Sequence, residues 1–175
     1  MLKKIAIGLA AIVAIILAMA AMQPNSFNVK RTIAIKAPAD KIVPLISDFH
    51  QWATWSPWEH LDPNMQRHFS GAASGVGAIY EWEGNSATGQ GRMEVTGVNV
   101  PASVTIKLDF IKPIEGHNNT EFTLATQGDT TAVTWTMTGP ATFMSKIMGV
   151  FVSMDSMVGK DFEKGLANMK AVAEK

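Results

Sequence analysis

The distribution of hydrophobic and polar residues divides the chain into three parts with different periodicities. Residues Ile5 to Met22 form an uncharged apolar run that follows two lysines. Beyond a linker at residues 23–26, apolar and polar residues alternate, which is typical of strands with one buried face. After Pro140, apolar residues recur every three or four positions, which is typical of an amphipathic helix. The pattern therefore predicts an apolar leader, a sheet and a C-terminal helix.

The apolar run is long enough to cross a membrane. Its eighteen residues would span about 27 Å as a helix, close to the hydrocarbon thickness of a bilayer. Two interpretations stay open: an uncleaved single-span anchor, which the length favours, or a signal peptide cleaved near Ala18-Met19-Ala20. Lys3 and Lys4 predict a cytoplasmic N-terminus, with the domain on the extracytoplasmic side of the inner membrane. Cleavage would instead release a periplasmic or secreted domain.

The alternating region predicts seven strands with two short helices after the first. The strands are expected at residues 27–35, 65–70, 77–83, 89–99, 103–111, 120–127 and 130–138, and the helices at 40–46 and 49–55. Gln127-Gly128-Asp129 is a tight hairpin signal, and Gly, Pro, Asn or Asp residues bound the other strands. Short consecutive strands joined by such turns predict an antiparallel sheet, because parallel pairing needs a long crossover after each strand.

The C-terminal segment predicts a helix that covers the sheet. Its apolar stripe consists of Phe143, Met144, Ile147, Met148, Phe151, Val158, Phe162, Leu166, Met169 and Val172. A fresh helix starting at Ser153 to Asp155 stays open as an alternative to one continuous helix. A seven-stranded antiparallel sheet has one apolar face to cover, and this segment is the only one long enough to cover it. The sequence therefore predicts an α+β fold in two parts: an anchor or signal segment with its linker at residues 1–26, and a ligand-binding domain at residues 27–175.

Composition excludes several classes of function. The chain has 175 residues, 47% of them hydrophobic, and no cysteine, which is typical of one globular domain plus a targeting segment and excludes disulfides and thiolate sites. Removing Lys3 and Lys4 from the fifteen basic residues leaves thirteen against fifteen acidic ones, with no basic stripe, so no nucleic-acid partner is expected. The histidine spacings predict no metal site, and GVGAIY leads into a strand rather than a helix, so no dinucleotide cofactor is expected.

Three segments are distinctive when taken together: VKRTIAIKAPADKIVPLISDFHQWATWSPWEHLDP, GVGAIYEWEGN and GQGRMEV. They resemble the SRPBCC or START-like superfamily, and more narrowly the small bacterial proteins labelled polyketide cyclase or dehydrase-like. The resemblance runs from about residue 27 to the C-terminus. It implies a helix-grip fold, in which a curved antiparallel sheet wraps around the C-terminal helix with an apolar cavity between them. It does not imply one reaction, since the superfamily includes lipid carriers, hormone-binding proteins and aromatic cyclases.

Aromatic and methionine residues supply the candidates for the cavity wall. Alternation in GVGAIYEWEGN places Tyr80 and Trp82 on one face, and tryptophan offers both apolar area and an N–H donor. Methionine tolerates irregular or changing apolar partners. The predicted ligand-binding residues are Trp55, Trp58, Tyr80, Trp82, Met93, Phe110, Trp135, Met148 and Phe151. An ordinary structural role stays open for the tryptophans, which would cap one end of the sheet, and for the methionines, which would fill a core.

Three functions remain open from the sequence. The first is non-catalytic binding of an apolar or amphipathic small molecule, lipid-like or polyketide-like. The second is a cyclase or dehydratase, for which Tyr80, Arg92, Glu94 and His60 are the candidate catalytic residues. The third is an envelope interaction module with an exposed tryptophan patch. Arg31, the one charge on the apolar face of the first strand, would pair with an acidic ligand group or extend its stem to the sheet edge.

Overall fold

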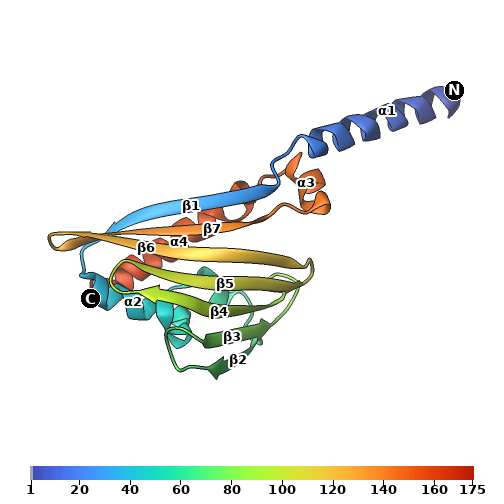
Figure 1. Ribbon diagram of the computed structural model, residues 1–175. Coiled ribbons are helices and arrows are strands. Elements are labelled where there is room, and N and C mark those ends of the chain that lie inside the picture. The colour runs from blue at the N-terminus through green and yellow to red at the C-terminus, as the bar shows by residue number, and fades with distance from the viewer. Residues whose placement is uncertain (1) are drawn as a thin grey trace.

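The computed structural model describes residues 2–175, which form an apolar N-terminal helix, a curved sheet and a helix packed on the sheet (Figure 1). The strands are β1 (Ser26–Ile35), β2 (Gln66–Gly71), β3 (Ala78–Glu83), β4 (Gln90–Asn99), β5 (Ser103–Lys112), β6 (Gly116–Gln127) and β7 (Thr130–Pro140). The helices are α1 (Leu2–Ala21), α2 (Ala39–Ser47), η1 (Phe49–Thr54), η2 (Pro57–His60), α3 (Phe143–Gly149) and α4 (Met154–Ala173). The 3-10 helices are η1 and η2.

The seven strands form one antiparallel sheet in the order β1-β7-β6-β5-β4-β3-β2. Each strand from β2 to β7 pairs with its neighbour in sequence, as the short turns require, and β1 joins the far edge by pairing with β7. Helix α4 packs on β1 and lies across the inner face of the sheet (Figure 1). The predicted α+β helix-grip architecture is confirmed.

The register of the strands determines which loops share an end of the sheet. Ser26 pairs with Pro140, and Gln90 pairs with both Lys112 and Glu83. The α1–β1 linker, the β3–β4 loop and the β5–β6 turn therefore lie at the same end, which we call the α1 end. Figure 1 shows α1 extending away from this end, while the C-terminus lies at the opposite one.

The core lies between the sheet and α4 and is rich in aromatic rings. Trp135 on β7 stacks on Phe162 of α4, with centroids 4.0 Å apart and ring planes 12° apart, and also on Phe122 of β6 at 4.8 Å. Gly165 permits this close approach, because a Cβ there would lie only 3.0 Å from the Trp135 ring. The stripe of Phe162, Leu166 and Met169 is buried as predicted.

The first half of the C-terminal stripe does not cover the sheet. Ser153 accepts a hydrogen bond from Ser156 N and starts a new helix there, so α3 and α4 are separate. Phe143, Met144, Met148 and Phe151 are 61%, 58%, 42% and 69% exposed. The prediction of one sheet-covering helix is therefore correct for α4 and wrong for α3, because the break turns the α3 stripe away from the sheet.

Two smaller predictions are also corrected. The segment at 49–55 forms the 3-10 helix η1, and Pro57 begins a second 3-10 helix, since proline is well suited to a first helical position. Strand β6 begins at Gly116, four residues before the predicted start at Thr120, where it continues the ladder with β5.

Candidate ligand cavity

A cavity of about 210 Å³ lies between the inner face of the sheet and α4, toward the α1 end. The sheet side is lined by Tyr80, Trp82, Met93, Phe110, Trp135 and Met137. The opposite side is lined by Trp52, Trp58, Glu59, Val158 and Phe162. Most of these side chains are apolar or aromatic, so the cavity suits an apolar occupant.

Period-two alternation builds the sheet wall, because Tyr80 and Trp82 point to the same face of β3. Across the ladder, Trp82 pairs with Gly91 of β4. A Cβ at Gly91 would overlap the Trp82 indole, so glycine leaves the space that the ring occupies. Trp82 Nε1 donates a 3.0 Å hydrogen bond to the carbonyl of Thr88 in the β3–β4 loop. These contacts hold the indole in the wall near the α1 end.

The three tryptophans of WATWSPWEHLDP occupy different positions. Trp52 Nε1 donates to the Ile46 carbonyl at 3.0 Å and Trp55 Nε1 to the Leu45 carbonyl at 2.8 Å. Both carbonyls belong to the last turn of α2, where a helix leaves acceptors unsatisfied. Trp52 forms part of the cavity wall, Trp55 is buried behind it, and half-buried Trp58 lines the cavity.

One donor in the wall has no partner. Trp135 is buried, and its Nε1 has no hydrogen-bond partner within residues 2–175. Leaving a buried N–H unpaired costs about 1–3 kcal/mol. The cavity wall therefore contains an indole N–H that donates no hydrogen bond to the residues that the structure describes.

The main polar feature of the cavity is a hydrogen-bond network centred on Glu59. This residue is buried, with only 6% of its surface exposed. Tyr80 Oη donates a 2.7 Å hydrogen bond to Glu59 Oε1, and Arg67 Nε donates a 2.8 Å bond to Oε2. Arg67 Nη2 also donates to the Glu59 carbonyl at 2.6 Å. Both carboxylate oxygens are thus bonded, as a buried carboxylate requires.

The network fixes the protonation of Tyr80. Burial raises the pKa of the Tyr80 phenol well above its ordinary value, and the hydrogen bond to the Glu59 carboxylate raises it further. The same carboxylate raises the pKa of Arg67 through its hydrogen bond. At neutral pH the cavity therefore has a neutral phenol on its wall, with the ionic pair behind it.

The cavity opens toward the α1 end. Among its lining residues, Ala87 in the β3–β4 loop is exposed, and the partly exposed ones are Trp58, Trp82, Thr88, Leu108, Phe110 and Val158. Val158 lies in the first turns of α4, and Asp155 of the same turns pairs with Arg31 in the middle of β1. The other end of α4 lies at the far end of β1, where Glu174 accepts from Lys36 N at 2.6 Å. The mouth is thus on the side of the molecule that carries α1.

Residues 26–174 match the model of the family described as "Polyketide cyclase / dehydrase and lipid transport". The chain belongs to this family. The polyketide cyclase/dehydrase and lipid transport family is part of the SRPBCC superfamily, which binds hydrophobic ligands. The resemblance predicted from the three sequence segments is therefore confirmed, and the match covers the sheet and α4 but not α1.

Solved structures of low sequence identity have the same fold. The major latex-like protein 151 of Panax ginseng is 14% identical with a TM-score of 0.62, over 87% of this chain and 100% of the other. Truncated norcoclaurine synthase of Thalictrum flavum is 14% identical with a TM-score of 0.60, over 86% and 95%. Aha1 of Colwellia psychrerythraea is 17% identical with a TM-score of 0.59, over 85% and 96%. No match is found among curated proteins.

Six of the nine residues predicted to bind ligand line the cavity of this family member. They are Trp58, Tyr80, Trp82, Met93, Phe110 and Trp135. The other three lie elsewhere: Trp55 is buried behind the wall, and Met148 and Phe151 are exposed on and after α3. The break before α4 explains why Met148 and Phe151 lie away from the cavity. The hydrogen bond from Trp55 Nε1 to α2 explains why Trp55 lies behind the wall. Ligand binding by the six lining residues stays a prediction.

Of the four candidate catalytic residues, the fold brings only Tyr80 to the cavity. Arg92 Nη2 donates to Glu94 Oε2 at 2.8 Å, and both lie on the outer face, because Met93 between them faces inward. His60 is exposed, with Nε2 3.1 Å from the Ala53 carbonyl. The exposed tryptophan patch of an interaction module is not formed either, since Trp52 and Trp55 are buried.

Glu59 is the functional candidate that the sequence did not reveal. Its neighbour His60 is exposed, and only the 3-10 turn of η2 directs the Glu59 side chain inward. Its partner Arg67 is eight residues away in a different element, β2, so the periodicity within either element does not reveal the pair. Arg31 is also reassigned: it donates to Asp155 at 2.7 Å and to Glu163 at 2.7 Å, so it joins β1 to α4. Its inward direction was correctly predicted, but its partners are acids of α4.

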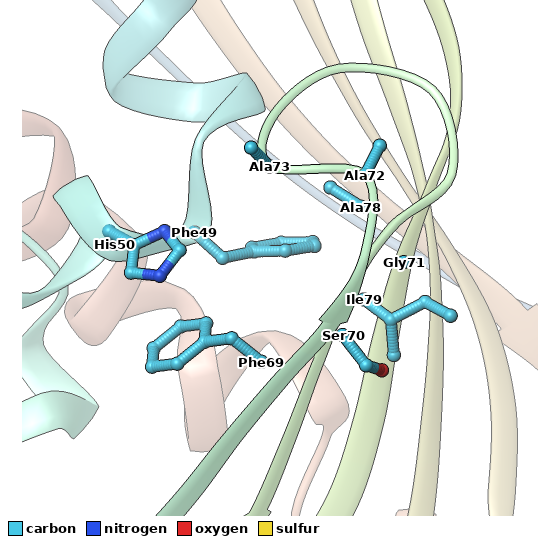
Figure 2. Close-up of a pocket in the computed structure, with 9 residues that line it drawn as sticks. All are labelled: Phe49, His50, Phe69, Ser70, Gly71, Ala72, Ala73, Ala78 and Ile79. Carbon is cyan, nitrogen blue, oxygen red and sulfur yellow. The ribbon is translucent and has the colours of Figure 1, made fainter.

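A second hollow of about 180 Å³ lies at the β2 edge of the sheet (Figure 2). Figure 2 shows the rings of Phe49 and Phe69 facing it from η1 and β2, with small residues of the β2–β3 turn around it. His50 stacks on Phe69 at 4.2 Å, and its Nδ1 lies 2.9 Å from Asp48 Oδ1. Partial burial acts to raise the pKa of Asp48, but the hydrogen bonds from His50 and Gln51 together outweigh it and lower the pKa. These groups pair with one another beside the hollow rather than converging on a reacting centre.

Metal chemistry receives no support from the side-chain arrangement. Within residues 2–175, no three His, Asp or Glu side chains are grouped so that they could hold an ion. The polar groups of the cavity are phenol, hydroxyl, carboxylate and indole.

Proposed function

We propose that this protein binds an apolar or amphipathic small molecule, lipid-like or polyketide-like, in the cavity between the sheet and α4, without transforming it. The cavity of about 210 Å³, walled by aromatic and methionine side chains, is the observation that carries the proposal. An apolar cavity of about 150 Å³ already binds benzene in another protein. This one has room for a ring or for the end of a chain, and a longer ligand would extend through the mouth beside Ala87.

The wall supports a ligand with one polar group. The Tyr80 hydroxyl donates its hydrogen bond to Glu59, so its oxygen is left to accept a hydrogen bond from a ligand hydroxyl. The unpaired N–H of Trp135 is available to donate to an acceptor atom of the ligand, once the ligand has displaced the surrounding side chains slightly. An amphipathic molecule would place this group against the network and its apolar part along Met93 and Phe110.

The N-terminal helix supports display of this domain on a membrane. Within residues 2–175, α1 is the one helix long and apolar enough to cross a bilayer. We propose that α1 is an uncleaved anchor, with the binding domain at residues 27–175 on the extracytoplasmic side of the inner membrane. Cleavage near Ala18-Met19-Ala20 would release the domain instead. Protease protection of the full chain in inverted and right-side-out vesicles distinguishes the orientations, and the N-terminal sequence of the mature chain shows whether the leader remains.

Native mass spectrometry of the full chain in mild detergent tests the binding proposal. An apolar molecule is expected to co-purify and to be displaced by a hydrophobic fluorescent probe. Met93→Trp, which fills the cavity, should abolish probe uptake, and the milder Leu108→Phe should reduce it. Met157→Trp is the matched control, since Met157 is exposed on α4. An empty chain that takes up no probe, or equal uptake by all variants, would contradict the proposal.

A catalytic function is the second candidate, and one observation favours it. Tyr80 and Glu59 form a hydrogen-bonded acid–base pair at the wall of a mostly apolar cavity. By turning its O–H from Glu59 to the ligand, the phenol would stabilise developing negative charge on a ligand oxygen, as a cyclase or dehydratase requires. Once the ligand is identified, Tyr80→Phe separates the two functions. Conversion of the ligand by the wild type but not by the variant, with binding retained, would establish catalysis.

A further inference from the structure

Helix α3 and the turn after it expose an apolar surface, which we call the α3 face. It consists of Phe143, Met144, Met148, Phe151 and Val152, all of them exposed. Met144, Met148 and Phe151 follow the i, i+4, i+7 spacing of one helical stripe. No element within residues 2–175 covers this stripe. A contiguous exposed apolar patch of this kind marks an interaction site.

The α3 face is fixed next to the end of α1. The two helices are in contact and lie together at the α1 end of the sheet (Figure 1). Lys146 Nζ donates a 2.6 Å hydrogen bond to Asn25 Oδ1, and Ala141 N donates to the Asn25 carbonyl at 2.8 Å. Asn25 belongs to the short linker after α1. When α1 lies in a bilayer, these bonds hold α3 within about 14 Å of the end of α1, because four extended residues span about that distance.

The charge of this region suits a lipid surface. Between Asp129 and Asp155 the chain has no acidic side chain, and its only basic one is Lys146. Interfacial helices combine aromatic and aliphatic side chains on one face with basic residues that approach lipid phosphates. Both the composition and the continuity with α1 therefore favour a bilayer as the occupant of this face over a second protein.

We propose that the α3 face inserts into the membrane interface as a second contact beside α1 and so sets the orientation of the domain. This proposal rests on α1 being the membrane anchor and goes beyond ligand binding. The mouth of the cavity lies at the same end, and exposed Ile114 of the β5–β6 turn lies there too. Docking of α3 turns the mouth toward the lipid surface, so that an apolar ligand passes between bilayer and cavity along a short path through water.

Single-cysteine labelling of the full chain tests this orientation, since the natural sequence has no cysteine. Met144→Cys and Phe151→Cys would report on the α3 face, and Ile12→Cys in α1 is the membrane reference. Val76→Cys and Val100→Cys are exposed controls at the far end of the sheet. Each variant receives a bimane label and is reconstituted into vesicles of phosphatidylcholine and phosphatidylglycerol with nitroxide-labelled lipid. The α3 labels and the Ile12 label should both lose fluorescence to the nitroxide-labelled lipid, and the two controls should not.

The other outcomes separate this proposal from those on which it rests. An unquenched Ile12 label would overturn both the anchor and the docking. If lipid quenches the Ile12 label but aqueous iodide quenches the α3 labels as strongly as the control labels, docking alone is overturned. If neither quencher reaches the α3 labels, a protein rather than lipid covers the α3 face, and the docking proposal is also overturned. When added to the labelled Phe151→Cys variant, Met148→Glu should reduce the quenching of the label by nitroxide lipid. Val100→Glu in the same variant should leave this quenching unchanged.

Discussion

The hydroxyl of Tyr80 lies 2.7 Å from Glu59 Oε1, and this contact joins the sheet to η2 at the wall of the cavity. The carboxylate would be expensive to bury alone, and Arg67 compensates it from the neighbouring strand at 2.8 Å. A polar site is therefore built into an apolar cavity by residues from three separate elements. The stability of this site and its protonation can both be measured.

Arg67→Ala should destabilise the domain far more than Arg92→Ala. The first removes the positive partner of a buried carboxylate, which costs about 3 kcal/mol. The second removes a partner of Glu94 on the outer face, and exposed ion pairs contribute about 0–1 kcal/mol. Urea unfolding of both variants gives the two values. Equal losses would show that the Glu59 network is no more important than a surface pair.

Tyr80 is the only tyrosine of the chain, so tyrosinate absorbance reports on this residue alone. Because its pKa is raised in the folded state, its contribution to stability is fully present below the unfolded pKa of about 10 and is lost as pH rises toward the folded pKa. We expect no tyrosinate signal near pH 10 in the folded chain. The signal should appear together with alkaline unfolding.

Guanidinium-unfolded chain is the control for this titration and should ionise near the ordinary tyrosine pKa. Tyr80→Phe should make the free energy of unfolding less dependent on pH above about 10. A folded chain that ionises like the unfolded one would contradict the buried hydrogen bond to Glu59.

Gly149→Ala should stabilise the chain, whereas Gly159→Ala should not. Replacing a helical glycine by alanine stabilises a helix by up to about 1 kcal/mol, and a Cβ at Gly149 meets no atom within 4 Å. A Cβ at Gly159 would overlap the Arg31 guanidinium and displace it from Asp155 and Glu163. Gly159→Ala should therefore be destabilising or neutral, and thermal unfolding compares the two variants.

The Arg31→Ala background isolates the cause of that difference. With the guanidinium removed, Gly159→Ala should become as favourable as Gly149→Ala. A persistent loss of stability in the double variant would mean that another contact of Gly159 is responsible.

Gly91→Ala should impair probe uptake by the cavity, whereas Gly97→Ala on the same strand should not. A Cβ at Gly91 would push the Trp82 indole out of its place in the wall, and overpacking of this kind costs about 1–3 kcal/mol. A Cβ at Gly97 would make only an ordinary 3.6 Å contact with Thr105. Titration of both variants with a hydrophobic fluorescent probe measures the effect. Unchanged uptake by Gly91→Ala would show that Trp82 does not shape the site.

Local patterns in the amino-acid sequence were sufficient to predict the strands, the sheet and the buried half of the C-terminal stripe. Alternation requires one buried face, and short turns between strands leave antiparallel pairing as the simplest solution. The same alternation correctly directed Tyr80, Trp82, Met93, Phe110 and Trp135 to the cavity side. The apolar composition of residues 5–22 also determined that α1 would be an uninterrupted apolar helix.

Which apolar residues are covered, and which polar residues come into contact, depends on how the elements pack. Periodicity reports that a helix has an apolar face, but not whether another surface is within reach of it. Phe162 and Phe151 therefore looked alike in the sequence, although one stacks on Trp135 and the other is exposed. Glu59 and Arg67 meet because a 3-10 turn and the start of β2 approach each other in space. Such an approach depends on the packing of the whole domain, and no local pattern encodes it.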